Sequence, residues 1–268
     1  MVDLKEMRKK HKILKKIDYI PSPVERGYSN KTLYVNISDL TIKEKPVTQQ
    51  MKDLFIGGKG FGLYLLWHGV NENTKWDSPE NEIVIACGPL GGSSTFSGSG
   101  KSLVTSISPT TGSVIDSNVG GHFGPLLKFA GWDALEIQGK ATNDIIVFID
   151  AKTKTISIEE APLEDVNAHL AAEEFTEMYA DSEHDKQNIS VVSAGIGSDH
   201  TLIGCLNFSW WDWRRQSTRI KQAGRGGIGS VFRNKKIKAI IVRTTNMRPK
   251  WHIQQRQSQP TSKGVSNG

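Results

Sequence analysis

A glycine-rich stretch between Gly88 and Gly131 constrains this chain more than any other feature. It reads GPLGGSSTFSGSGKSLVTSISPTTGSVIDSNVGGHFGPLLKFAG, and ten of the chain's 26 glycines fall in these 44 residues. Glycine adopts positive φ and lets a ligand approach the backbone closely. Two interpretations stay open: a cradle of backbone N–H groups around a polyanion or a large polar cofactor, and a set of tight turns between strands.

The order of apolar segments predicts an α+β fold. Strand-like runs occur at residues 31–37, 41–45, 82–87, 101–107, 113–115, 134–137, 145–149, 155–158, 188–192, 202–206 and 236–242. Helical patterns occur at residues 47–55, 63–70, 125–131 and 163–179, and we interpret the Trp-rich segment 209–219 as a loop. Strands and helices do not alternate regularly, which favours large mixed β-sheets with a few short helices over a doubly wound fold.

Both ends of the chain differ in composition from the middle. The net charge is +6, and residues 1–30 form a basic segment that we expect to be a flexible, solvated arm. Contact with nucleic acid or an anionic surface is the alternative use of this arm. Residues 244–268 are polar, hold few aliphatic side chains, and are predicted to be disordered. The basic residues near the N-terminus are Lys5, Arg8, Lys9, Lys10, Lys12, Lys15 and Lys16.

Neither a membrane span nor a cysteine-ligated metal site is expected from this sequence. No apolar run approaches the roughly 20 residues that a membrane-spanning helix needs. Cys87 and Cys205 are the only cysteines and form no Cys-x-x-Cys pair, so this chain alone cannot ligate zinc or an iron–sulfur cluster. The default location is the reducing cytoplasm.

Two short glycine motifs resemble nucleotide-binding signatures without matching them. In GSGKS, residues 98–102, the first glycine of a P-loop would stand at Thr95, and the following residues favour a strand over a helix. In GKGFG, residues 58–62, Leu65 occupies the place of the third dinucleotide-binding glycine, so we attribute these glycines to helix packing against a sheet.

Basic and aromatic residues near the C-terminal end offer further candidates. Arg225 lies between two glycines, an arrangement that suits an anion clamp, although a solvated turn would look the same. Trp210, Trp211 and Trp213 are interleaved with arginines. They could stack single-stranded nucleic acid, but a hydrophobic contact with a missing partner domain is the interpretation we favour.

Five segments, in order, resemble the N-terminal domain of the aldehyde ferredoxin oxidoreductase family. They are LFIGGKGFGLYLL, SPENEIVIACGPLGG, SISPTTG, SNVGGHFGPLLKFAGWDALEIQGKA and AGRGGIGSVFRNKKIKAIIV, and the likeness covers residues 31–243. The family includes tungsten-dependent aldehyde oxidoreductases and the tungsten subunit of benzoyl-CoA reductases. The resemblance implies a saddle of two β-sheets that carries a tungsten bis-pterin cofactor, with a magnesium ion bridging the two pterin phosphates.

The resemblance also implies site residues. Lys101 stands where the family usually has a pterin-contacting arginine, and Gly120 falls at a pterin contact. Asn118 and Gln222 fall where backbone carbonyls reach the magnesium ion. Lysine at 101 keeps the charge of arginine but loses its bidentate geometry. The second pterin-binding loop corresponds to Lys221, Gln222, Gly224 and Arg225.

The function implied is the tungstopterin-binding part of an enzyme that oxidises an aldehyde to a carboxylate and passes electrons to ferredoxin. The family's 4Fe–4S ligands and its helical domains lie downstream of the matching region and are absent from this sequence. We therefore expect a domain that is inactive alone: a truncated product, a fragment, or a subunit completed by a separate cluster-bearing subunit. The alternatives are a non-catalytic remnant that serves as a partner-binding scaffold and, less favoured, a basic nucleic-acid-binding protein.

Overall fold

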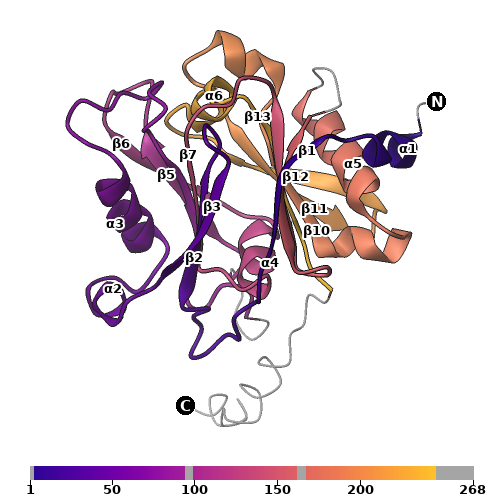
Figure 1. The fold of residues 1–268 in the computed structure, drawn as a ribbon, viewed down its shortest axis with the longest axis horizontal. Coiled ribbons are helices and arrows are strands. Elements are labelled where there is room, and N and C mark those ends of the chain that lie inside the picture. The colour runs from indigo at the N-terminus through magenta and orange to yellow at the C-terminus, as the bar shows by residue number, and fades with distance from the viewer. Residues whose placement is uncertain (1–2, 94–98, 162–166, 246–268) are drawn as a thin grey trace, which may run out of the picture.

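The computed structural model describes residues 3–93, 99–161 and 167–245, which form two β-sheets on either side of a central core (Figure 1). The first sheet has seven strands in the order β1-β9-β8-β13-β10-β11-β12. These are β1 (Ile13–Asp18), β8 (Ile145–Asp150), β9 (Thr155–Glu160), β10 (Ile189–Ser193), β11 (Leu206–Asp212), β12 (Ser217–Ala223) and β13 (Ile237–Arg243).

The second sheet has six strands in the order β3-β2-β7-β4-β5-β6. Both sheets are mixed, because β8 and β13 run parallel, as do β2 and β7, while the other neighbours are antiparallel. The predicted α+β class with two large mixed sheets is therefore confirmed. The strands are β2 (Lys31–Asn36), β3 (Thr41–Pro46), β4 (Ile83–Ala86), β5 (Ser102–Ile107), β6 (Val114–Val119) and β7 (Ala134–Gln138).

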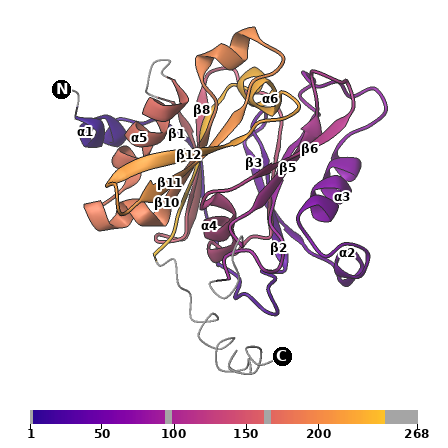
Figure 2. The same ribbon diagram turned by 180° about the vertical axis from the view of Figure 1, so that it is seen from behind.

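Helices fill the middle and cover the two outer faces (Figures 1 and 2). The central core holds side chains from both sheets together with the apolar sides of α4 (Phe123–Phe129) and α6 (Ile228–Asn234). On the outer face of the seven-stranded sheet lie α1 (Leu4–Lys9) and α5 (Ala168–Tyr179), and on that of the six-stranded sheet lie α2 (Gln49–Leu54) and α3 (Lys59–Gly69). Two short 3₁₀ helices are η1 (Glu183–Asn188) and η2 (Ile196–His200).

The GKGFG glycines have the packing role expected of them. A Cβ added to Gly62 would lie 2.4 Å from the Thr105 Oγ1 on β5, and one on Gly60 would lie 2.6 Å from the Phe55 Cβ. Glycine therefore lets α3 approach the sheet closely. The GSGKS segment likewise does not open a helix, because β5 begins at Ser102.

The Trp-rich segment is a β-hairpin, so its interpretation as a loop was wrong. β11 and β12 pair from Leu206↔Ala223 to Asp212↔Ser217, and the predicted strand at residues 202–206 overlaps β11 only at Leu206. The Asp212 carboxylate accepts hydrogen bonds from the backbone N–H groups of Arg214 and Arg215 and closes the turn. The charged turn hid two strands whose aromatic and β-branched residues suit a sheet.

The expected free N-terminal arm also differs in the structure. β1 pairs antiparallel with β9, and α1 packs beside α5. The Glu159 carboxylate accepts a hydrogen bond from Arg8 (2.9 Å), lies 3.1 Å from the His11 Nδ1, and accepts another from the Tyr179 hydroxyl (2.8 Å). This buried network binds the segment to the domain, which a count of lysines could not predict.

Two further predictions concern residues outside the described ranges. The predicted disordered tail lies there from residue 246 onward, and so do residues 163–166, the start of the predicted helix whose described part contains α5. Within the described residues, no helix is long and apolar enough to cross a membrane.

Candidate functional site

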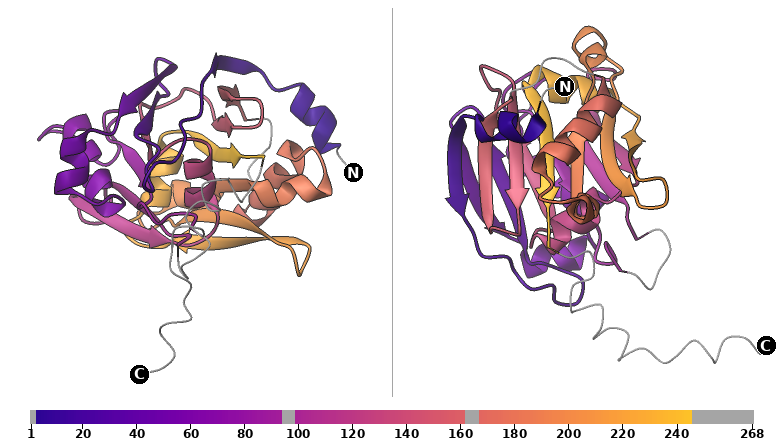
Figure 3. Two further views of the ribbon diagram at one scale, coloured as in Figure 1. Left: turned by 90° about the horizontal axis from the view of Figure 1, so that it is seen from below. Right: turned by 90° about the vertical axis from the view of Figure 1, so that its right-hand side faces the viewer.

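The candidate site is a groove between the free edges of the two sheets. β6 is the last strand of the six-stranded sheet and β12 the last strand of the seven-stranded sheet, and the two strands lie against each other (Figure 3, left). The cavity between them measures about 640 Å³. Edge strands carry backbone N–H and C=O groups that no neighbouring strand uses. The groove is lined by Lys101, Asp116, Ser117, Asn118, Gln222, Gly224 and Arg225.

The β6 wall is positioned by full antiparallel pairing with β5, from Ser102↔Val119 to Ile107↔Val114. Along β6, Ser117 and Val119 are buried while Asn118 is exposed, as strand alternation requires. Lys101 immediately precedes β5 and is exposed at the same end of the groove. The glycine-rich stretch thus brings one amide and one ammonium group to this wall.

The β12 wall ends in the second glycine cluster. Gly224 and Arg225 follow β12, and Gly226 and Gly227 then turn the chain into α6 with φ of +73° and +67°. A Cβ on Gly226 would lie 2.6 Å from the Ile115 side chain on β6. The Arg225 backbone N–H donates to the Ser117 Oγ at 3.2 Å. Glycine is needed here because the turn must lie directly against the opposite wall.

The groove carries an excess of positive charge. Within the described residues, the side chains of Lys101, Lys221 and Arg225 have no hydrogen-bond or ion-pair partner. The Asp116 carboxylate is already paired with the Lys59 ammonium at 2.7 Å. Three exposed cations beside unpaired strand edges suit a ligand with several negative charges.

Most residues proposed from the sequence lie together. Lys101, Asn118, Gln222, Gly224 and Arg225 line the same cavity, although they come from two regions more than 100 residues apart. The remaining two, Gly120 and Lys221, lie next to each other, since a Cβ on Gly120 would be 3.7 Å from the Lys221 Cγ.

Sequence reasoning missed three residues at this site. Asp116 and Ser117 line the groove, and Lys59 holds Asp116. Lys59 lies in the GKGFG motif, which explained only the packing of α3. The sole available signal was the proximity of Asp116 and Ser117 to Asn118 in the chain, and proximity does not tell which side chains face a ligand.

The residues present limit how a metal ion could be held. The described part of the chain contains no group of three or more His, Cys, Asp or Glu side chains that could hold one. A cation in the groove would therefore depend on carbonyl oxygens and on oxygens of the bound ligand. Magnesium accepts such oxygen ligands, and it commonly keeps phosphates and waters in its coordination shell.

Comparisons with known proteins match most of this chain. A family model described as "Aldehyde ferredoxin oxidoreductase, N-terminal domain" matches residues 32–244. A tungsten-containing aldehyde ferredoxin oxidoreductase of Pyrococcus horikoshii is 35% identical over 218 residues, covering 81% of this chain and 33% of that protein. The aliphatic sulfonate oxidoreductase, WOR-like subunit, of Pyrococcus furiosus is 27% identical over 231 residues, 83% of this chain and 35% of that protein.

The fold has a solved counterpart. The active site complex BamBC of benzoyl coenzyme A reductase, in complex with 1,5-dienoyl-CoA, contains a chain that superposes with a TM-score of 0.70 at 26% identity. The match covers 82% of this chain and 31% of that one. This chain therefore spans about a third of the length of the relatives it matches.

Proposed function

This chain belongs to the aldehyde ferredoxin oxidoreductase family, as its N-terminal domain, and on that premise we propose that the groove between β6 and β12 anchors a tungsten bis-pterin cofactor. One observation carries the proposal: two distant segments of the chain converge on one groove that is lined by two unpartnered cations, Lys101 and Arg225, with Lys221 beside Gly120. Relatives of this chain are tungsten-containing enzymes.

The residues present fit the paired phosphates of such a cofactor. Lys101 would meet one phosphate as a point charge, and Arg225 could meet the other with its planar fork. Gly120 and Gly224 leave room for the ligand beside the backbone, since a Cβ on either meets no atom closer than 3.7 Å. The backbone carbonyls of Asn118 and Gln222 would be the protein's ligands to a bridging magnesium ion.

The reaction we propose for the complete enzyme is oxidation of an aldehyde to a carboxylate, in which water supplies the added oxygen, three protons are released, and two electrons leave toward ferredoxin. When bound, the cofactor supplies the redox chemistry. The residues of this chain bind and orient it: the cations neutralise its phosphates, and the two sheets hold the groove walls at a fixed separation. Lys59 contributes indirectly, because its ion pair with Asp116 reduces the repulsion between the Asp116 carboxylate and the phosphates.

The cluster-bearing part of the enzyme would come from elsewhere in the assembly. The proposal includes a separate or downstream helical region that ligates a 4Fe–4S cluster, because Cys87 and Cys205 are free cysteines, one of them buried. A reducing, cytoplasmic location is part of the same proposal.

The alternatives receive less support. Trp210 and Trp211 are consecutive strand residues and so face opposite sides of the sheet; Trp211 is buried, and Trp210 lies 5.7 Å from the His122 ring. Only Trp213, at the hairpin turn, is exposed, so the three indoles do not form one stacking or docking platform. In the basic segment, Arg8 is engaged by Glu159 and Lys12 by Glu160, which lowers the charge available to nucleic acid.

Metal and pterin analysis tests the proposal. The protein would be purified anaerobically from cells given tungstate, with and without a co-expressed cluster-bearing subunit. We expect tungsten and pterin to co-purify with the wild type under at least one condition, and both to fall at least about tenfold in Arg225→Ala and Lys101→Ala, as loss of charge-assisted phosphate contacts requires.

Two matched variants control for charge alone. Arg214 and Lys43 are exposed and lie outside the groove, so Arg214→Ala and Lys43→Ala should retain tungsten at the wild-type level. Tungsten-free protein under both conditions would contradict the proposal. Equal loss in the groove variants and the controls would also contradict it.

A further inference from the structure

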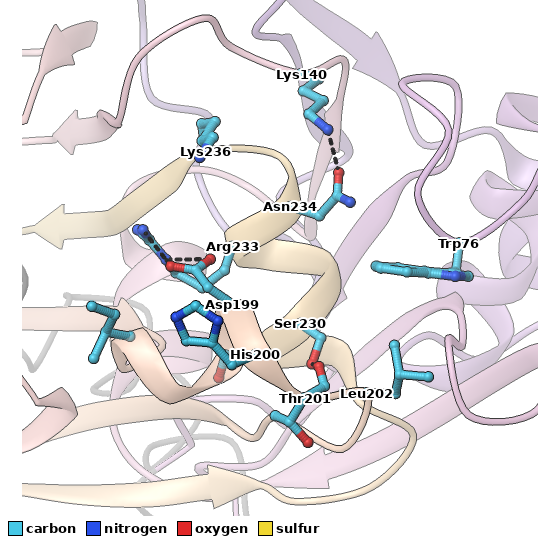
Figure 4. Close-up of a pocket in the computed structure, with 12 residues that line it drawn as sticks. Trp76, Lys140, Asp199, His200, Thr201, Leu202, Ser230, Arg233, Asn234 and Lys236 are labelled. Atoms are coloured by element: carbon cyan, nitrogen blue, oxygen red, sulfur yellow. Dashed lines mark hydrogen bonds and ion pairs between the residues drawn. The ribbon is translucent and has the colours of Figure 1, made fainter.

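A second cavity, separate from the groove, lies beside α6 (Figure 4). Its volume is about 740 Å³, within the range of small-molecule sites, which is roughly 300–1,000 Å³. Trp76, from the loop before β4, stands on one side of it, and His200, at the end of η2, stands on another. The groove and this cavity share no lining residue.

The charges within the cavity wall nearly cancel. The Arg233 side chain contacts Asp199 at 3.0 Å and Asp144 at 3.0 Å, and Lys238 lies 3.7 Å from Asp144. Two cations and two carboxylates thus neutralise one another, and Arg233 and Lys238 are themselves buried. This cluster shapes the wall and contributes no net attraction for an anion.

The cations at the rim are not neutralised. The Lys140 ammonium donates to the Asn234 Oδ1 at 2.8 Å, which is an uncharged partner. Within the described residues, the side chains of Lys236 and His200 have no hydrogen-bond or ion-pair partner. Figure 4 shows Lys140 and Lys236 along the same side of the cavity. An anionic group bound there would meet two ammonium groups without displacing a carboxylate.

The opposite wall suits a flat apolar ring. Among the described residues, no other ring stacks on the Trp76 ring, and Leu202, 51% exposed, lines the same cavity. The amide nitrogen of Asn234 has no partner among the described residues and lies between the ammonium of Lys140 and the Trp76 ring. It therefore offers a hydrogen-bond donor to a polar ring edge. Indole faces stack well on planar heterocycles.

We propose that this cavity binds a mononucleotide, with the base against Trp76 and the phosphate at Lys140 and Lys236. A simple anion would use only the rim, and an uncharged aromatic molecule would use only the wall. A base and a phosphate joined by a sugar use both halves of the cavity. The segment from Arg225 to Ser230 passes from the groove to this cavity, so the two sites are neighbours in the chain without being the same site.

Isothermal titration of the full chain with AMP and GMP tests this proposal, with adenosine and inorganic phosphate as half-ligands. We expect a nucleotide to bind at concentrations below about 1 mM, and each half-ligand to bind at least about tenfold more weakly. No nucleotide binding at that concentration would overturn the proposal. Equal affinity for phosphate and nucleotide, or for adenosine and nucleotide, would overturn it as well.

Variants locate the binding. Lys140→Ala combined with Lys236→Ala should weaken nucleotide binding on the order of tenfold, and Trp76→Leu by a similar factor. Lys75→Ala removes an exposed charge next to Trp76 that does not line the cavity, and should leave affinity unchanged. Because Trp76 packs partly on the core, the lysine double variant decides the outcome if Trp76→Leu does not fold.

A groove variant separates this site from the proposed cofactor site. Arg225→Ala should leave nucleotide binding unchanged while it abolishes tungsten retention. Loss of nucleotide binding in Arg225→Ala, with no effect of the lysine double variant, would assign the nucleotide to the groove and overturn this inference. Loss of tungsten without loss of nucleotide binding would leave both proposals standing independently.

Discussion

The basic side chains of the groove differ from those of the interior in burial and in hydrogen-bond partners. At the groove, Lys101 and Arg225 are exposed and have no partner among the described residues, and the same holds for Lys221 on β12. In the interior, Lys128 is completely buried and donates to the Asp133 carboxylate at 2.8 Å and to the Gly27 carbonyl at 2.7 Å. The fold gives Lys128 a carboxylate partner and leaves the groove cations without one.

The difference separates residues that hold the fold from residues available to a ligand. The Asp133 carboxylate also accepts hydrogen bonds from the backbone N–H groups of Ser29 (3.0 Å) and Asn30 (2.8 Å), so the pair connects α4 to the loop before β2. Lys128 also donates to the carbonyl of Gly88, where the glycine-rich stretch begins. Burying an ion without a counter-charge is energetically costly. An exposed ion is solvated by water, so it remains available to bind a ligand.

Breaking the interior pair should give the largest effect. Asp133→Asn keeps the shape of the side chain but leaves the Lys128 ammonium buried without its counter-charge. We expect a loss of about 3–5 kcal/mol in the free energy of unfolding, measured by urea denaturation.

An exposed ion pair provides the control for that measurement. Lys152 and Asp181 lie 2.6 Å apart with side chains 39% and 56% exposed, so Lys152→Met should cost less than about 1 kcal/mol. Similar losses in the two variants would show that burial does not distinguish the two classes of cation.

A buried carboxyl without a close cation should give the next largest effect. Burial raises the pKa of Glu82 to about 8, and its Oε2 has no hydrogen-bond partner among the described residues. The folded state therefore holds a proton that the unfolded state releases above its ordinary pKa, so this group's stabilising contribution falls as pH rises from about 4.5 to about 8.

Glu82→Gln should remove that dependence. Relative to the wild type, the variant should gain about 2 kcal/mol or more in free energy of unfolding between about pH 5 and pH 8. Burial lowers the pKa of Lys235 to about 7, which gives an opposing trend above that pH. The Glu82 carboxylate raises the pKa of Lys235, so Glu82→Gln also changes this trend, and the two proteins are compared most directly below that pH. A difference between the two proteins that does not vary with pH would contradict this assignment.

Removing the groove cations should give the smallest effect on stability. Combined substitution of Lys101 and Arg225 by alanine breaks no side-chain pair, so we expect a change within about 0.5 kcal/mol in the free energy of unfolding. Thermal and urea denaturation beside the tungsten assay would check this. A loss of several kcal/mol would mean that these residues support the fold and would remove the contrast with Lys128.

Local sequence patterns predicted the strands and helices whose run of apolar residues is not interrupted by charged residues. The predicted strand at 82–87, apolar from Ile83 onward, became β4, and the helix that follows the GKGFG glycines became α3. The hairpin β11–β12 was missed because Asp212, Arg214 and Arg215 made its turn look like a long polar loop. The same charges form the turn through contacts with the Asp212 carboxylate, which no single-residue propensity describes.

The site was predictable only in part, and for a specific reason. Its residues were proposed from resemblance to a family motif, and five of the seven line one groove in the structure. Asp116 and Lys59 could not be found in this way, because their pairing joins β6 to α3 across 57 positions of the chain. Nor could the cavity beside α6 be predicted, since Trp76, Lys140, His200 and Lys236 belong to four separate loops or helix ends.

By itself, the sequence determined the class of fold, because apolar runs are local properties, and it indicated the family through the resemblance of five ordered segments. Only the tertiary structure decided which cations are neutralised and which stay free. Charge pairing in this molecule depends on distances between segments far apart in the chain, as for Lys59 and Asp116 or Arg8 and Glu159. The composition gives the number of charged residues, but their partners can be identified only from the tertiary structure.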